Sequence, residues 1–147
     1  MIAPSNPFSW QSRIRFVDTD ASGRIHYTAI FRHFEAAEFG FMRAIGHPYG
    51  IMDPTQVVRY PRVHVECDFN SALRCDDVIS TEVTVERVGG SSYTLGFSVM
   101  HNDRQAARGK ITVVCMNSGT GRSHPLPADL AETLRARLVT GVTNPQS

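Results

Sequence analysis

The sequence of 147 residues lacks several features that mark specialised classes of protein. Its apolar runs are too short to cross a membrane, because a spanning helix needs about 20 consecutive apolar residues. The N-terminal segment MIAPSNPFSW has neither a basic segment nor a continuous apolar stretch, so it does not resemble a signal peptide. Three cysteines without a CxxC pair favour free thiols. Together these absences predict a cytoplasmic protein that does not bind a membrane.

The sequence also lacks a large excess of positive or negative charge, and it lacks the common catalytic motifs. A net charge of +1 gives no reason to expect nucleic acid as a partner. HExxH, GxGxxG, P-loop and GxSxG motifs do not occur, and the six histidines do not fall at metal-ligand spacings. We therefore expect no zinc site. The length fits a single domain over 1–147, with loosely ordered ends at 1–10 and 139–147.

Hydrophobic periodicity predicts one long helix followed by a run of antiparallel strands. The helix is predicted from Ala29 to Ile45, with Thr28 as its N-cap and Gly46 as its stop. A second helix over 127–138 has Pro127 at its start. Strands are predicted over 8–17, 57–69 with an irregularity at Pro61, 78–88, 92–102 and 104–117. This order predicts an α+β fold in which a curved antiparallel sheet wraps around one long central helix.

The long helix is apolar over most of its circumference, and its few polar residues are informative. Gly40 lies roughly opposite the broad apolar arc, so a second element can approach closely there. Glu38 falls inside the arc, which leaves two interpretations. It is either a surface acid that reaches solvent or an arginine such as Arg43, or a carboxylate aimed into a cleft. His33 and His47 are expected to decorate the helix and its exit loop.

The segment from Asp18 to Tyr27 gathers carboxylates, a flexible turn, an imidazole and a helix start within a few residues. A helix start offers unpaired backbone N–H groups that can polarise a carbonyl oxygen. A carboxylate just upstream can then attack that carbonyl or activate water. The structural alternative is that Asp18, Asp20 and Ser22 only form side-chain turns and cap backbone amides.

This segment resembles the acyl-CoA thioesterases of the hot-dog fold, in the branch that includes 4-hydroxybenzoyl-CoA thioesterase. The family signature is arginine–aromatic–x–Asp–x–Asp–x–x–Gly, then an aromatic pair opening the helix and an acidic residue midway along it. Its counterparts in this sequence are Arg15, Phe16, Asp18, Asp20, Gly23, Tyr27 and Glu35. The strands FNSALRCDDVISTEVTVERVGGSSYTLGFSVMHN and AARGKITVVCMN also resemble the family, so the similarity covers about residues 12–138.

The resemblance implies a role for each residue of the signature. Asp20 would be the catalytic carboxylate, acting as nucleophile or as general base, and the Tyr27 N–H would be the oxyanion donor. Asp18, Gly23 and Glu35 would support them. Some family members carry a histidine seven residues after this aspartate, whereas here Tyr27 stands there and the histidine is His26. A supporting contact or core packing is therefore as good an interpretation of His26 as catalysis.

The resemblance also implies that no metal or redox cofactor is needed, and it implies a substrate and an assembly. The substrate would be an acyl-CoA or aryl-CoA thioester, or alternatively an acyl carrier protein thioester, and the protein a homodimer at least, with a homotetramer expected. Coenzyme A carries phosphates, which need basic side chains and free N–H groups. The candidates are Arg87, Gly89, Gly90, Ser91 and Arg108.

Two other functions stay open at this point. A hot-dog dehydratase or hydratase would carry a histidine followed by a Pro–x–Phe–Pro–Gly-like segment, which this chain lacks. A non-catalytic acyl-binding module would have no need of Asp20.

Overall fold

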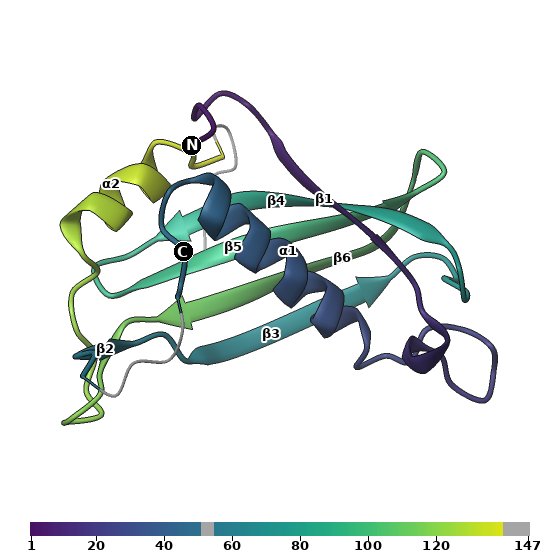
Figure 1. The fold of residues 1–147 in the computed structure, drawn as a ribbon, viewed down its shortest axis with the longest axis horizontal. Helices are drawn as coiled ribbons and strands as arrows, with labels where there is room; N and C mark the ends of the chain where they lie inside the picture. Colours follow the sequence, from purple (N-terminus) through teal and green to yellow (C-terminus); the bar gives the residue numbers. More distant parts are fainter. Residues whose placement is uncertain (51–54, 140–147) are drawn as a thin grey trace.

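A five-stranded antiparallel sheet forms one layer of the molecule, and the long helix α1 (Ile30–Ala44) lies across one of its faces (Figure 1). The structure, a computed structural model, describes residues 1–50 and 55–139. The strand order is β1-β4-β5-β6-β3. These strands are β1 (Phe8–Arg13), β3 (Arg62–Phe69), β4 (Val78–Val88), β5 (Ser92–His101) and β6 (Arg104–Val114). The predicted α+β fold is confirmed.

The smaller elements lie at one end of the sheet, and α1 starts at the opposite end (Figure 1). Two short strands, β2 (Val58–Arg59) and β7 (Met116–Asn117), pair with each other, and α2 (Ala128–Arg135) follows. Within residues 1–50 and 55–139, none of the helices has the length and apolar character that a membrane span requires.

The core lies between α1 and the sheet face that it covers. Strict alternation along β4 buries Ile79, Val83 and Val85 on this face, as expected when only one face of a sheet is covered. From α1, the ring of Phe34 stacks on the ring of Phe97 of β5, with centroids 4.7 Å apart. Aromatic pairs of this kind stabilise a fold beyond their buried area. The stack anchors the first half of α1 on the middle of the sheet.

Gly40 of α1 is the point at which β1 comes closest to the helix. A Cβ built on Gly40 would lie 2.5 Å from a ring carbon of Trp10. No side chain other than hydrogen fits this gap, so the expectation that a small residue permits close approach is confirmed. Arg43, one turn later, covers the indole from outside, with its Cζ 5.7 Å from the ring centroid.

Glu38 is buried, and it does not pair with Arg43. Its side chain is only 1% exposed. Its Oε2 accepts hydrogen bonds from Arg62 Nη2 at 2.6 Å and from the Tyr49 hydroxyl at 2.5 Å. The interpretation as a surface acid is therefore wrong. The partners come from the loop after α1 and from the first residue of β3, both distant in sequence.

Several predicted boundaries differ from the structure. The first strand ends at Arg13 rather than 17, because the chain turns there into the 3₁₀ helix η1 (Phe16–Asp18). The predicted strand 57–69 is split at Pro61, which cannot donate a ladder hydrogen bond, so the irregularity predicted there is confirmed. The predicted strand 104–117 is likewise interrupted, between β6 and β7.

The helix starts also differ. α1 begins at Ile30, and its N-cap Ala29 makes no side-chain cap hydrogen bond. Thr28 is therefore not the cap, because its hydroxyl bonds His26 Nδ1 instead, at 2.8 Å. α2 begins one residue after Pro127, as the proline signal predicts, and it ends at Arg135.

The chain ends were predicted to be loosely ordered. The first residues are hydrogen-bonded to both helical regions: Ile2 N–H donates to the Ala44 carbonyl, and the Arg137 guanidinium donates to the carbonyls of Ala3 and Asn6. Residues 8–10 already belong to β1. Beyond Val139, whose N–H donates to the Val85 carbonyl, the predicted loose end lies outside the described residues.

Candidate active site

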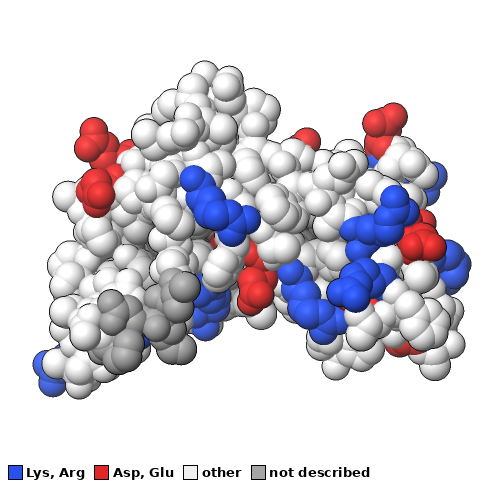
Figure 2. Space-filling model, in the orientation of Figure 1, with Lys and Arg blue, Asp and Glu red and all other residues white. Residues whose placement is uncertain are grey.

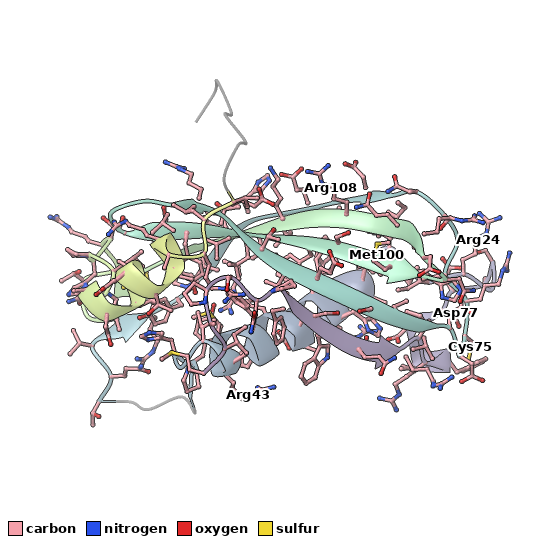
Figure 3. All side chains as sticks on the ribbon, turned by 90° about the horizontal axis from the view of Figure 1, so that it is seen from above. Arg24, Arg43, Cys75, Asp77, Met100 and Arg108 are labelled. Carbon is pink, nitrogen blue, oxygen red and sulfur yellow. The ribbon has the colours of Figure 1, made fainter. Side chains whose placement is uncertain are left out.

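The predicted site lies in the loop that links β1 to α1, at the end of the sheet where β3 ends and β4 begins. Two isolated bridges shape the loop: Thr19 pairs with Ile25 inside it, and Arg24 pairs with Arg74 of the β3–β4 connection. Figure 3 shows Arg24 at this end of the molecule, near Cys75 and Asp77. Two segments that are about fifty residues apart in sequence thus form one surface.

Asp20 is exposed in this loop, and its two oxygens are used differently. Oδ1 accepts hydrogen bonds from the hydroxyl of Ser22 at 2.5 Å and from the Ser22 N–H at 2.8 Å. Oδ2 accepts none from the described part of the chain. The Ser22 hydroxyl and N–H hold the pKa of Asp20 below its usual value. Asp20 is therefore ionised at neutral pH, with one oxygen anchored and the other available.

Gly23 closes the turn that presents Asp20. Its N–H donates to the Asp20 carbonyl at 3.0 Å, and its φ is +80°. Residues with a side chain rarely adopt this backbone conformation. The nearest atom to an added Cβ would be Arg74 Nη1 at 4.0 Å, so space is not limiting. The turn therefore requires glycine because of its φ angle.

His26 and Tyr27 form the entry to α1. Their rings stack, with centroids 4.7 Å apart, and the His26 carbonyl accepts the Ala29 N–H at 2.9 Å. The backbone thus turns in a helical sense before α1 formally begins. Within residues 1–50 and 55–139 the Tyr27 N–H has no hydrogen-bond acceptor, which is the state expected of an oxyanion donor. The His26 ring bonds Thr28 and makes no hydrogen bond to Asp20.

A pocket of about 380 Å³ brings Asp20 and Tyr27 together. Its walls come from the loop and from the end of β3 with the residues that follow. They are Asp20, Ser22, Arg24, Ile25, Tyr27 and 69–73. Five of these ten residues are apolar or aromatic and five are polar or charged, so the pocket combines apolar walls with polar groups that could orient a ligand.

Asp18 lies beneath this surface, buried between β1 and α1. Oδ2 accepts hydrogen bonds from the Arg15 N–H at 2.8 Å and from His33 Nε2 at 2.9 Å. Oδ1 pairs with Arg32 Nη2 at 3.1 Å. Burial by itself raises the pKa of a carboxyl group, but these three donors outweigh it and lower the pKa of Asp18. Asp18 is therefore a buried anion that holds the loop to α1.

His33 is part of this network, so the expectation that it decorates the helix surface is wrong. Its residue is 8% exposed, and its Nδ1 lies 2.9 Å from the Ser12 hydroxyl. The helical pattern shows only that His33 is next to the buried Phe34 on the helix. It does not show that a carboxylate fifteen residues earlier faces it.

The remaining predicted site residues lie outside the pocket that contains Asp20 and Tyr27. Glu35 is exposed on α1. Gly89, Gly90 and Ser91 form the β4–β5 hairpin, at the far end of β5 from Asp20, and a strand of that length spans roughly 30 Å. Arg108 lies on the face of the sheet opposite α1 (Figure 3), and so does Arg87, paired with the outward-facing Thr94. One chain therefore does not bring these groups to Asp20.

Other residues of the pocket were not predicted from the sequence. Arg24, Phe69 and Ser71 carry no motif, and two of them belong to the end of β3 and the connection after it. Only the position of β3 at the edge of the sheet places Phe69 and Ser71 beside the loop that contains Arg24 and Asp20. Among the described residues, no group of three His, Cys, Asp or Glu side chains could hold a metal ion.

Comparison with known proteins identifies the class. Residues 14–134 match the Thioesterase-like superfamily, and the chain belongs to this family. It is similar to the 1,4-dihydroxy-2-naphthoyl-CoA hydrolase of Synechococcus elongatus, with 26% identity over 87% of this chain and 95% of that one. It is also 22% identical to the acyl-CoA thioesterase YbgC of Haemophilus influenzae, over 85% and 92% of the two chains.

A solved structure supports the fold. The 1,4-dihydroxy-2-naphthoyl-CoA thioesterase of Synechocystis superposes with a TM-score of 0.81 at 16% identity, over 88% of this chain and 96% of that one. These findings confirm the predicted hot-dog fold and the predicted enzyme class, a thioester hydrolase.

Proposed function

We propose that the protein hydrolyses acyl-CoA or aryl-CoA thioesters, with Asp20 as the catalytic carboxylate. The observation that carries this proposal is one pocket that holds an ionised Asp20 and the Tyr27 N–H, where neither Asp20 Oδ2 nor this N–H has a hydrogen-bond partner among residues 1–50 and 55–139. Hydrolysis needs both groups. A nucleophile or base starts the reaction, and a donor stabilises the oxygen that becomes negative.

Two routes fit these groups. As a general base, Asp20 takes a proton from water, the water oxygen bonds to the carbonyl carbon, and the C–S bond breaks as the proton passes to the thiolate. As a nucleophile, an Asp20 oxygen bonds to the carbonyl carbon, the thiolate leaves, and water then hydrolyses the mixed anhydride. In both routes the Tyr27 N–H donates to the carbonyl oxygen, and the products are a carboxylic acid and a thiol.

The walls of the pocket suit an apolar or aromatic acyl group. Ile25 and Leu73 are buried at its base, while the rings of Tyr27 and Phe69 are 68% and 45% exposed at its rim. Aromatic faces at a rim can stack on a planar substrate. On the face seen in Figure 2, basic side chains gather over the half of the molecule that holds the loop. They would attract an anionic coenzyme A ester over a neutral one.

The pocket also adjoins an edge of the sheet that has no further strand among the described residues, and we propose that a second copy of the chain covers it. β3 is an edge strand of the sheet, with Val63 62% and Val65 48% exposed, and Phe69 of the pocket belongs to the same strand. Exposed apolar edges favour pairing with another strand. A homodimer, and its association into a homotetramer, would bury them. Light scattering that finds an active monomer at micromolar concentration would contradict the proposal.

The deciding experiment is a hydrolysis assay with a panel of acyl-CoA and aryl-CoA esters and their acyl carrier protein counterparts. Asp20→Asn should fold normally and lose turnover by about a hundredfold or more. Asp18→Asn is the matched control, because the same change at a buried structural anion should reduce stability more and rate less. Equal loss of rate without loss of stability would contradict these roles. Hydration of an enoyl-CoA, or binding without turnover, would favour the dehydratase or the binding module.

A further inference from the structure

A buried histidine lies directly behind the candidate catalytic loop, and the proposed chemistry does not use it. The imidazole of His33 lies between Ser12 of β1 and Asp18 of η1, with both ring nitrogens in hydrogen bonds of 2.9 Å. We propose that His33 is a positioning residue that acts through Asp18 to hold Asp20 and the Tyr27 N–H in one pocket. This inference rests on the proposed function of Asp20.

The Asp18 carboxylate joins the start of η1 to α1. It is held by the N–H of Arg15, the N-cap of η1, and by His33 and Arg32 of α1. Arg32 is mostly exposed, with 59% of its side chain in solvent, whereas the His33 side chain is only 9% exposed. The buried bond is shielded from water and salt, so it constrains Asp18 more than the exposed one does.

The backbone of Asp18 positions both candidate catalytic groups. The Asp18 carbonyl accepts the His26 N–H at 2.7 Å, directly before Tyr27. Asp20 follows two residues later, and its N–H donates to the Arg24 carbonyl at 2.9 Å. A shift of Asp18 would therefore move the oxyanion donor and the carboxylate relative to each other. Displacement of a reacting group by about 1 Å can reduce a rate a hundredfold.

Histidine suits this position because each of its ring nitrogens meets a different partner. An ionised carboxylate only accepts hydrogen bonds. His33 Nε2 therefore carries a hydrogen and donates a hydrogen bond to Asp18. Nδ1 faces the Ser12 hydroxyl, which can either donate or accept, so this contact orients the ring in either charge state. Leucine would fill the volume without a donor. Glutamine can place an amide N–H close to the position of Nε2.

The experiment compares His33→Leu, His33→Gln and a matched control, Leu134→Ala. Leu134 is fully buried in α2, far from the loop, so its truncation lowers stability without touching the site. For His33→Leu we expect kcat for an acyl-CoA ester to fall about tenfold, with KM within about twofold of the wild type. His33→Gln should recover most of that loss, and Leu134→Ala should keep the wild-type kcat well below its melting temperature.

Hydrogen exchange at the His26 amide gives a readout that does not depend on activity. Loss of the His33–Asp18 bond should accelerate this exchange in His33→Leu but not in Leu134→Ala. The inference is overturned if His33→Leu keeps kcat, if His33→Gln is no better than His33→Leu, or if exchange is unchanged. Should His33→Leu not fold, two other variants test the same contacts. Ser12→Ala removes the hydrogen bond between Ser12 and His33, and His33→Gln tests the bond to Asp18. Failure of the proposed function would look different: Asp20→Asn would keep full activity, while exchange at His26 still responded to His33.

Discussion

Removal of Arg62 should destabilise the protein more than removal of Arg62 and Glu38 together. Glu38 is the most deeply buried acidic residue of α1, and Arg62 and Tyr49 both bond its Oε2. Burial, together with Tyr93 and Glu38 nearby, raises the pKa of Tyr49 far above its usual value, so its hydroxyl stays a donor. In Arg62→Met the carboxylate would keep one hydrogen bond and lose its counter-charge.

The magnitude follows from burial. Breaking a buried ion pair by removing one partner costs about 3–5 kcal/mol, whereas replacing both partners with apolar residues is often close to neutral. The Arg62 side chain is 32% exposed, so solvent screens part of the interaction and the lower end of this range applies. Arg62→Met should therefore lower the free energy of unfolding by about 3 kcal/mol. For a domain of this size that is roughly 6–12 °C in melting temperature.

The double variant Glu38→Met/Arg62→Met is the internal control. Without Glu38, the Tyr49 and Tyr93 hydroxyls keep the hydrogen bond between them, so no buried charge remains and one of the two hydroxyls loses an acceptor. We expect the double variant to recover at least half of the loss, measured by urea unfolding at neutral pH with the slope of the transition compared between variants. If the double variant is as unstable as Arg62→Met or less stable, the buried carboxylate is not the cause of the loss.

Three further predictions concern the site and the helix. Ser22→Ala removes the hydroxyl that lowers the pKa of Asp20, so the acidic limb of the pH profile of kcat/KM should move to higher pH; an unchanged limb would exclude Asp20 as the titrating group. Gly40→Ala should destabilise the fold by about 1–3 kcal/mol in thermal unfolding despite the better helix propensity of alanine, because the new Cβ would overlap the β1 indole, and a stabilised variant would contradict the close approach. Arg87 and Arg108 would reach the pocket only from the proposed second copy of the chain, and neutralising both should then raise KM for acyl-CoA several-fold at constant kcat and affect a pantetheine thioester less; equal effects on both substrates would show that the nucleotide binds elsewhere.

The candidate site could be predicted in part because its central residues are close in sequence. Asp20, Gly23 and Tyr27 lie within one loop, and the requirement for a positive φ at Gly23 is a local property of the turn. The order of helix and strands was also predictable, because a sheet covered on one face leaves a period of two and a helix a period near 3.6.

Other features depend on contacts that the local pattern does not encode. His33 and Glu38 look alike in sequence, as polar residues on an apolar helix. Each is buried together with a partner from another element: His33 donates a hydrogen bond to Asp18, and Glu38 pairs with Arg62. The far wall of the pocket, at Phe69, likewise comes from the edge strand of the sheet. The sequence by itself determined the chemistry of the loop, because that chemistry follows from neighbouring residues. Only the tertiary structure decided which buried charges are paired and what encloses the pocket, because both depend on how distant segments pack.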